Sequence, residues 1–175
     1  EGQVVQVYVV DVTVTERGPK VLISRTHPGL VKRMFEMEVP EINDELESLL
    51  IQVIEEAQGK MEQGEVFPPF TATVMGDKLF TETHGGTIDE CFESARDAVL
   101  NVAGARMYAF CYDGYIDTDE GDKDAIIAEG GMAGDEQAVV VGMMYDADEN
   151  GAVAGFSDEI VYIAESENFL ADVAP

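Results

Sequence analysis

The sequence predicts an α+β fold, with two helices on a mostly antiparallel sheet, preceded by a separate piece of two strands and a helix. Three observations predict this architecture. Two amphipathic stretches with helical spacing begin near residues 43 and 87, and four strand-like segments follow the second of them. The distribution of charge also changes abruptly near residue 42, which indicates that two parts of different character meet there.

The charge asymmetry defines the predicted domain boundary. The chain has 175 residues, 46% of them hydrophobic, and a formal net charge of −26. Residues 1–42 hold five Lys/Arg and six Asp/Glu, a net of −1, whereas residues 43–175 hold five and thirty, a net of −25. The apolar content excludes a simple disordered chain. A phosphate backbone would be repelled by the second part, so we expect domains at 1–42 and 43–175 with different partners.

The first part begins with alternating β-branched residues, which favour a half-buried strand. The stretch "VVQVYVVDVTVT" (4–15) is followed by a turn, "ERGPK" (16–20), and by the returning strand "VLIS" (21–24). The next stretch, "HPGLVKRMFEMEV" (27–39), has helical spacing and Pro28 near its first turn. The sequence therefore predicts a hairpin and then a short helix.

Residues 4–42, "VVQVYVVDVTVTERGPKVLISRTHPGLVKRMFEMEVPEI", closely resemble the bacterial transcription elongation factor NusA. The resemblance covers residues 2–42 and corresponds to the end of that family's OB-fold barrel and the start of its first K-homology domain. It implies binding of nascent RNA and of RNA polymerase, in pausing, termination and antitermination. Nothing after Ile42 supplies the K-homology GxxG loop, and an OB fold needs five strands where two are present.

The resemblance also suggests which side chains would contact RNA. The candidate phosphate contacts are Arg17, Lys20, Arg25, Lys32 and Arg33. Phosphates are bound mainly by Lys and Arg, so these five side chains are of the type that contacts an RNA backbone. The alternative is that the five side chains form a solvated basic face, and we favour it for so short a fragment.

The second part opens with a predicted amphipathic helix over residues 43–65, whose Asp44 and Glu47 fit a reciprocal cap. Its expected buried stripe is Leu46, Leu49, Leu50, Val53, Ile54, Ala57 and Met61. Residues 71–75 and 78–83 flank Gly-Asp and predict a hairpin.

A second helix is predicted over residues 87–104. Thr87 and Glu90 form a capping box at its start, and Gly104 is the expected stop. The expected buried residues of this helix are Ile88, Cys91, Phe92, Ala95, Val99 and Val102. Four strands are then predicted, over residues 106–117, 124–130, 137–147 and 158–166.

Four features of the second part could bind or react, and each has a plainer explanation. "DADENG" (146–151) opens like a calcium loop, but its twelfth position is Ser157 instead of Glu, which favours a β-turn. "DTDEGDKD" (117–124) could bind a cation or a basic partner, but a solvated loop between strands is favoured. His84 precedes a helix where an anion could lie, although a plain turn is favoured. Cys91 and Cys111 are expected to be packed thiols.

The sequence gives no positive sign of an enzyme. It contains no phosphate loop, dinucleotide fingerprint, nucleophile elbow or zinc-ligand spacing, so no catalytic residue, metal or cofactor is predicted. Two cysteines make no disulfide framework, and neither a membrane span nor a signal peptide is visible, which favours the cytoplasm.

Two function hypotheses of different class remain. In the first, the chain is a fragment of a transcription elongation, termination and antitermination factor joined to an acidic domain. In the second, the acidic domain binds a basic protein partner and the N-terminal segment is passive. A metal-dependent hydrolase that uses the loop acids is a third, weaker hypothesis.

Overall fold

A computed structural model describes residues 8–15, 18–24 and 41–175, the last range with its side chains. The chain divides into two compact units, residues 1–41 and 42–175, which are described separately. The helix predicted over residues 27–39 lies outside the described residues.

The first unit contains an antiparallel hairpin of β1 (Tyr8–Thr15) and β2 (Gly18–Ser24). Thr15 pairs with Gly18 next to the turn, and the register shifts between Val9 and Asp11. The predicted strands are therefore present. The second strand begins earlier than expected because the predicted turn residues Gly18 and Pro19 already pair with β1.

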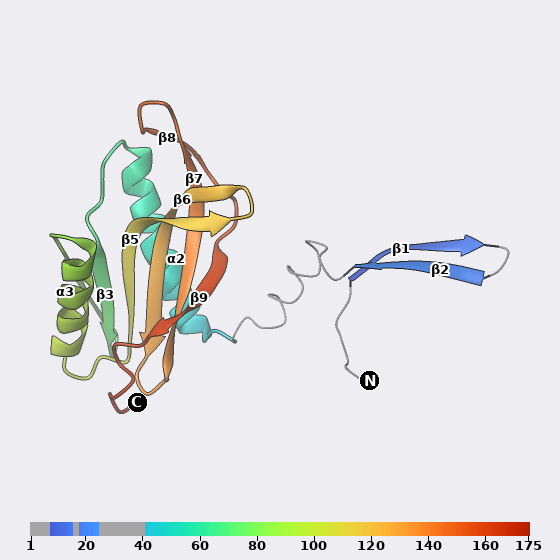
Figure 1. Cartoon of the computed structure of the whole chain (residues 1–175). Coiled ribbons are helices and arrows are strands. Elements are labelled where there is room, and N and C mark those ends of the chain that lie inside the picture. Colours follow the sequence, from blue (N-terminus) through green and yellow to red (C-terminus); the bar gives the residue numbers. More distant parts are fainter. Residues whose placement is uncertain (1–7, 16–17, 25–40) are drawn as a thin grey trace. The chain divides into compact units, whose positions relative to one another are not determined.

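The second unit combines two helices with an antiparallel sheet of seven strands (Figure 1). Its elements are α2 (Asp44–Glu62), β3 (Phe70–Met75), β4 (Lys78–Thr83), α3 (Ile88–Asn101), β5 (Met107–Thr118), β6 (Gly121–Met132), β7 (Gln137–Ala147), β8 (Val153–Phe156) and β9 (Val161–Glu167). The strand order is β4-β3-β5-β6-β7-β8, and β9 also pairs with β7. The predicted α+β fold is confirmed.

Helix α2 forms as predicted, but its cap is a different residue. Asn43 has extended backbone angles, and its Oδ1 accepts a hydrogen bond of 2.9 Å from the Glu45 amide. Asp44 is already the first helical residue, so the predicted Asp44–Glu47 cap is wrong by one position. The apolar stripe is correct: six of its members are buried and Met61 packs against them.

Helix α3 begins with the predicted capping box. The Thr87 amide donates to Glu90 Oε2 at 2.7 Å, and the Glu90 amide donates to Thr87 Oγ1 at 3.3 Å. The helix ends at Asn101, and Gly104 follows with a φ of +81°. Ile88 is 49% exposed instead of buried, because it lines an open surface hollow at the start of the helix.

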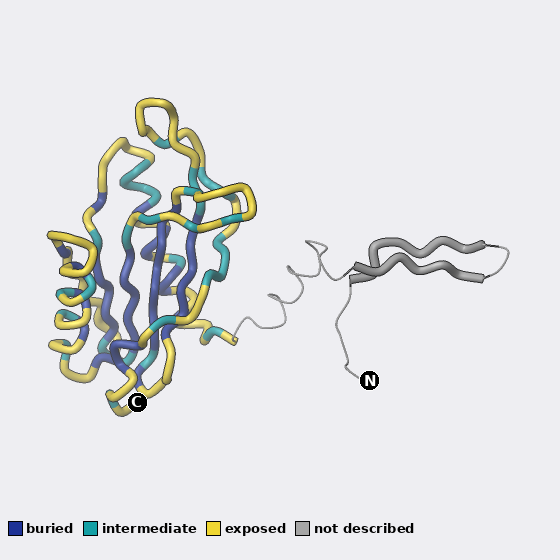
Figure 2. Tube along the Cα trace, in the orientation of Figure 1, coloured by how far each residue is buried: buried dark blue, intermediate teal, exposed yellow. Residues whose placement is uncertain are grey.

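The two faces of the sheet carry separate cores, because successive side chains of a strand point to opposite faces. Met107, Ala109 and Cys111 of β5 belong to the cluster beneath α2. Tyr108 and Phe110 belong to the cluster beneath α3. Figure 2 shows the buried residues concentrated along the central strands.

The loop predicted at residues 117–124 is a tight hairpin instead, because β5 and β6 continue into the acidic run. Asp117 pairs with Asp122. Thr118 closes the turn by donating from Oγ1 to the Gly121 carbonyl at 2.6 Å, and Gly121 adopts a φ of +106°. The four aspartates of the run remain exposed, as expected of a solvated charge run. The short strand β8 was not predicted.

Replacing Gly130 with Ala is expected to destabilise the second unit by about 1–3 kcal/mol, the usual cost of overpacking. A Cβ at this position would lie 2.6 Å from the Tyr108 carbonyl oxygen and 3.0 Å from Leu50 Cδ2. Gly155→Ala is the matched control, since a Cβ there meets nothing within 4 Å. Urea unfolding of the two variants measures the difference, and equal midpoints would contradict this account of the packing.

Candidate functional site

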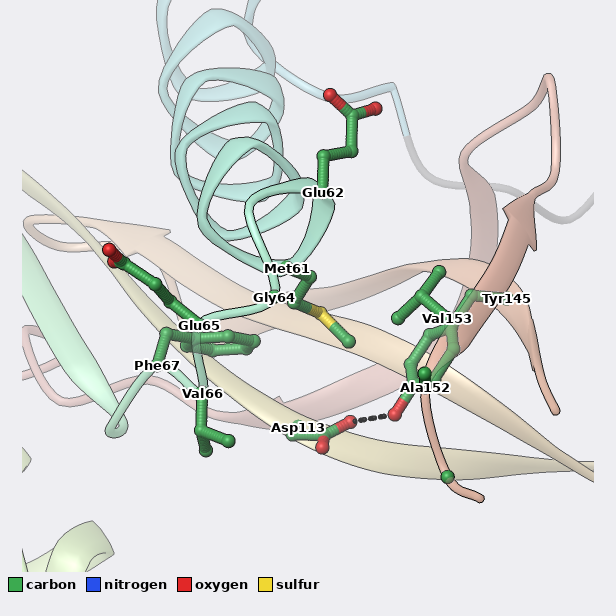
Figure 3. Close-up of a pocket in the computed structure, with 11 residues that line it drawn as sticks. Met61, Glu62, Gly64, Glu65, Val66, Phe67, Asp113, Tyr145, Ala152 and Val153 are labelled. Carbon is green, nitrogen blue, oxygen red and sulfur yellow. Dashed lines mark hydrogen bonds between the residues drawn. The ribbon is translucent and has the colours of Figure 1, made fainter. Parts of the chain in front are cut away.

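A partly enclosed hollow of the second unit lies between the end of α2 and the β7–β8 hairpin (Figure 3). We call it the Asp113 pocket; its lining includes Met61, Val66, Phe67, Asp113, Tyr145 and Val153. Its volume is about 290 Å³, which is just below the range for small-molecule sites, about 300–1,000 Å³. The pocket therefore suits a single side chain or a ligand of similar size.

Two polar groups face each other across this pocket. The Tyr145 hydroxyl on β7 donates a hydrogen bond of 2.7 Å to Asp113 Oδ1 on β5. Asp113 reaches solvent at the pocket mouth, but the surrounding walls remove enough water to raise the pKa of its carboxyl above the usual value, and the nearby Asp124 acts in the same direction. The hydrogen bond from Tyr145 opposes this shift and fixes the orientation of the carboxylate.

The pocket is acidic without a resident cation. Glu62 and Glu65 belong to the lining, but their carboxylates point away from the Asp113–Tyr145 pair in Figure 3. No Lys or Arg of residues 41–175 lines the pocket. The nearby Lys60 is held elsewhere, 2.9 Å from Glu56 and 5.2 Å from the centroid of the Phe70 ring. This arrangement suits a cationic group with an apolar stem.

The opposite face of the sheet carries a larger and more apolar hollow of about 490 Å³, lined among others by Tyr115, Ile127 and Ile163. The polar side chains next to this hollow bond to one another and stabilise the fold. The buried Glu129 accepts hydrogen bonds from the Tyr112 hydroxyl at 2.7 Å and from Ser166 Oγ at 2.8 Å. Both carboxylate oxygens of Glu129 are therefore occupied by the fold itself.

His84 lies in the predicted turn that leads into α3, but its side chain is buried in the core instead of facing an anion site. Its ring is 3% exposed. Nε2 lies 3.1 Å from Thr71 Oγ1, and Nδ1 lies 2.8 Å from Ser94 Oγ. Burial lowers the pKa of His84, and the charge of Glu82 opposes that effect more weakly. The two hydroxyls hold the neutral imidazole in place between β3 and α3.

This burial predicts a pH dependence of stability. Because the folded-state pKa of His84 is lowered, the unfolded chain binds the proton more tightly. The stabilising effect is present above the unfolded pKa of about 6.5 and is lost as the pH falls through the folded value. We expect the free energy of unfolding to decrease as the pH falls below about 6.5, and His84→Gln to remove this slope.

The control for this experiment is His27→Gln, which alters the other histidine of the chain and should leave the slope in place. Urea unfolding at half-unit pH steps measures the effect. A slope that survives in His84→Gln would show that another group is responsible.

The predicted RNA contacts are mostly beyond the described part of the chain. Lys20 lies on β2, where it pairs with Thr13. Arg17, Arg25, Lys32 and Arg33 lie outside the described residues. The grouping of the five basic residues into one surface therefore stays a prediction.

The calcium-like motif forms the predicted turn. Asp148 Oδ1 accepts hydrogen bonds from the amides of Asn150 at 2.8 Å and Ala152 at 2.9 Å, so its carboxylate closes the β7–β8 connection. Among the described residues, no group of three or more His, Cys, Asp or Glu is placed to hold a metal ion.

Both cysteines are buried, as predicted for packed thiols. Cys91 is 2% exposed and Cys111 is fully buried, with its Sγ 3.7 Å from the Val53 carbonyl oxygen. Burial raises the pKa of Cys111, which disfavours the reactive thiolate. No helix in the described ranges is long and apolar enough to cross a membrane.

Sequence reasoning missed the hydrogen-bonded pair of the Asp113 pocket, Asp113 and Tyr145. They are separated by 32 positions along the chain, and nothing in their local motifs links them. One signal was available for Asp113. It interrupts the otherwise apolar stretch "MYAFCYDGY", and an acid at the end of a buried strand needs either solvent or a partner.

The chain is similar to curated proteins over about 40 of its residues. The transcription termination/antitermination protein NusA of Bacillus subtilis is 58% identical over 40 residues, which are 23% of this chain and 11% of that protein. NusA of Halalkalibacterium halodurans is also 58% identical over 40 residues, 23% of this chain and 10% of that protein. NusA of Mycobacterium bovis is 51% identical over 43 residues, 25% of this chain and 12% of that protein.

The chain therefore spans about a tenth of the length of the curated relatives it matches. No family model matches the sequence, and no solved structure matches it. The predicted resemblance is confirmed, and the chain carries a partial NusA-like segment.

Proposed function

We propose that this chain is a binding protein, not an enzyme, whose N-terminal segment contacts RNA and RNA polymerase in transcription termination or antitermination. The observation that carries the proposal is the 58% identity to NusA over 40 residues. Five of the chain's ten Lys/Arg residues lie in its first 42 positions, and phosphate binding depends chiefly on such side chains. The proposal also places the chain in the cytoplasm, with the polymerase.

RNA binding by the full chain tests this proposal. We expect a single-stranded RNA to bind with an affinity that falls as salt increases. The double variant Lys32→Gln/Arg33→Gln should bind more weakly and should reduce the slope of log K against log salt by about 1.4, which corresponds to two lost phosphate contacts.

The matched control is Lys78→Gln/Lys123→Gln, which removes the same charge from the second unit. An equal loss of affinity in the control would assign the effect to net charge instead of to a binding surface. No RNA binding by the full chain at low salt would overturn the proposal.

The second candidate function is a protein-interaction module, and the charge of the second unit favours it. Residues 43–175 carry a net charge of −25. Of their five basic side chains, three form salt bridges: Lys60 with Glu56, Arg96 with Glu167 and Arg106 with Glu45. The surface is therefore strongly negative, and such a field attracts basic partners and speeds their association.

Residues 43–175 contain three hydrophobic clusters of their own, so we expect them to fold alone. A lysine-rich peptide should bind both this fragment and the full chain, and added salt should weaken both complexes equally. Binding that requires residues 1–42 would contradict the second candidate function.

A further inference from the structure

We propose that the Asp113 pocket is the point at which the second unit captures a lysine or arginine side chain of a basic protein partner. The inference rests on the interaction-module function proposed above and names its specific contact. Four features of the pocket carry it: its size, its one inward-facing carboxylate, its apolar and aromatic walls, and the open groove beside it.

The carboxylate is the recognition element. Asp113 is fixed by the hydrogen bond of 2.7 Å from Tyr145, so binding a cation does not first require ordering a mobile side chain. Charge-assisted hydrogen bonds are about twice as strong as neutral ones. The pocket has no basic residue of its own among residues 41–175, so an incoming cation meets no competitor.

The walls fit the stem that precedes such a cation. Met61, Val66 and Val153 present aliphatic surface, and the rings of Phe67 and Tyr145 complete the lining. Val66 is 93% exposed and gives a partner apolar area to cover. Lys and Arg bury their methylene stems against such surfaces while their charged ends reach an acid.

A groove continues from the pocket and could hold the backbone of the same partner. A neighbouring hollow of about 450 Å³ shares Met61, Glu62 and Val153 with the Asp113 pocket. Its own lining adds Gln58 and Asp158. A peptide that lies along this hollow meets acids and an amide, which suits a basic segment. A small free amine would fill the pocket alone, so the walls and groove together favour a protein segment.

Titration of the full chain with N-acetyl-lysine methylamide and N-acetyl-arginine methylamide tests the site. Backbone amide shifts in NMR spectra report where each probe binds. We expect shifts at Asp113, Tyr145 and Val153 with at least one of the two probes. The uncharged N-acetyl-norleucine methylamide should bind about tenfold more weakly, since it lacks the charge-assisted contact.

Two substitutions separate a specific site from a general acidic surface. Asp113→Asn keeps the size of the side chain and removes its charge, and should weaken probe binding about tenfold or more. Glu136→Gln removes one charge from the turn between β6 and β7, which does not line the pocket. This variant should change the affinity little. The site would be overturned by equal affinities for Asp113→Asn and the unaltered chain, or if neither the lysine nor the arginine probe binds more tightly than the norleucine probe.

A lysine-rich peptide titrated in parallel distinguishes this inference from the function on which it rests. If the peptide binds and Asp113→Asn has no effect, the pocket assignment fails while the module stands. If the lysine or arginine probe binds at Asp113 but no basic peptide does, the pocket is a cation site and the module function fails. Peptide binding that Asp113→Asn weakens and Glu136→Gln does not supports both.

Discussion

Phe110→Ala is expected to lower the free energy of unfolding of the second unit by about 3–5 kcal/mol, the usual cost of removing a buried aromatic side chain. Phe110 is fully buried on β5. Its ring centroid lies 5.0 Å from that of Phe92 on α3 and 5.2 Å from that of Tyr112. The residue therefore joins the sheet to α3, and its loss leaves a cavity at their junction.

Phe80→Ala is the matched control, since Phe80 is 42% exposed on β4. We expect it to cost less than about 1 kcal/mol, as most exposed substitutions do. Urea unfolding followed by circular dichroism gives both values. Similar losses in the two variants would mean that the cluster beneath α3 contributes little to the stability of the unit.

Asn168→Ala is expected to destabilise the second unit by about 2–4 kcal/mol, because three backbone groups lose their partner. Asn168 is 2% exposed. Its Nδ2 donates to the Met132 carbonyl at 2.8 Å and to the Asp135 carbonyl at 2.7 Å, while its Oδ1 accepts from the Leu170 amide at 3.0 Å. One side chain thus attaches the C-terminal segment to the β6–β7 turn.

The control for Asn168→Ala is Asn101→Ala, at the exposed end of α3. It should change the unfolding midpoint little. Hydrogen exchange adds a local measurement, because the Leu170 amide should lose protection in Asn168→Ala before the central strands do. Retained protection at Leu170 would show that other contacts hold this segment.

Local chemistry explains what the sequence could predict. The capping box of Thr87 and Glu90 and the apolar stripe of α2 depend on neighbours within one helix, so pattern alone located them. The Gly-Asp turn between β3 and β4 also depends only on residues that are adjacent in the sequence. The β1–β2 hairpin was also found from alternation and a turn.

What the sequence did not reveal depends on contacts between distant segments. His84 is buried because Thr71 and Ser94 provide hydroxyls from two other elements. Strand β8 was missed because its four residues carry little alternation, and its pairing with β7 defines it. The Asp113 pocket needs a helix end, a hairpin and two strands to meet, which no local pattern records.

The strand order of the sheet has a consequence for self-association. At one margin, β8 and β9 divide the outer side of β7 between them, so that strand offers little free backbone. At the other margin lies β4, all six of whose residues are exposed, including the apolar Leu79 and Phe80. A strand with an open side is a template for pairing with another chain.

The strong negative charge of residues 43–175 opposes that pairing, since two copies repel each other before their strands meet. This protection is electrostatic and is screened over about 10 Å at 0.1 M salt. The solubility of the unit therefore depends on ionic strength as well as on its sheet. The acids that favour a basic partner also keep identical copies apart.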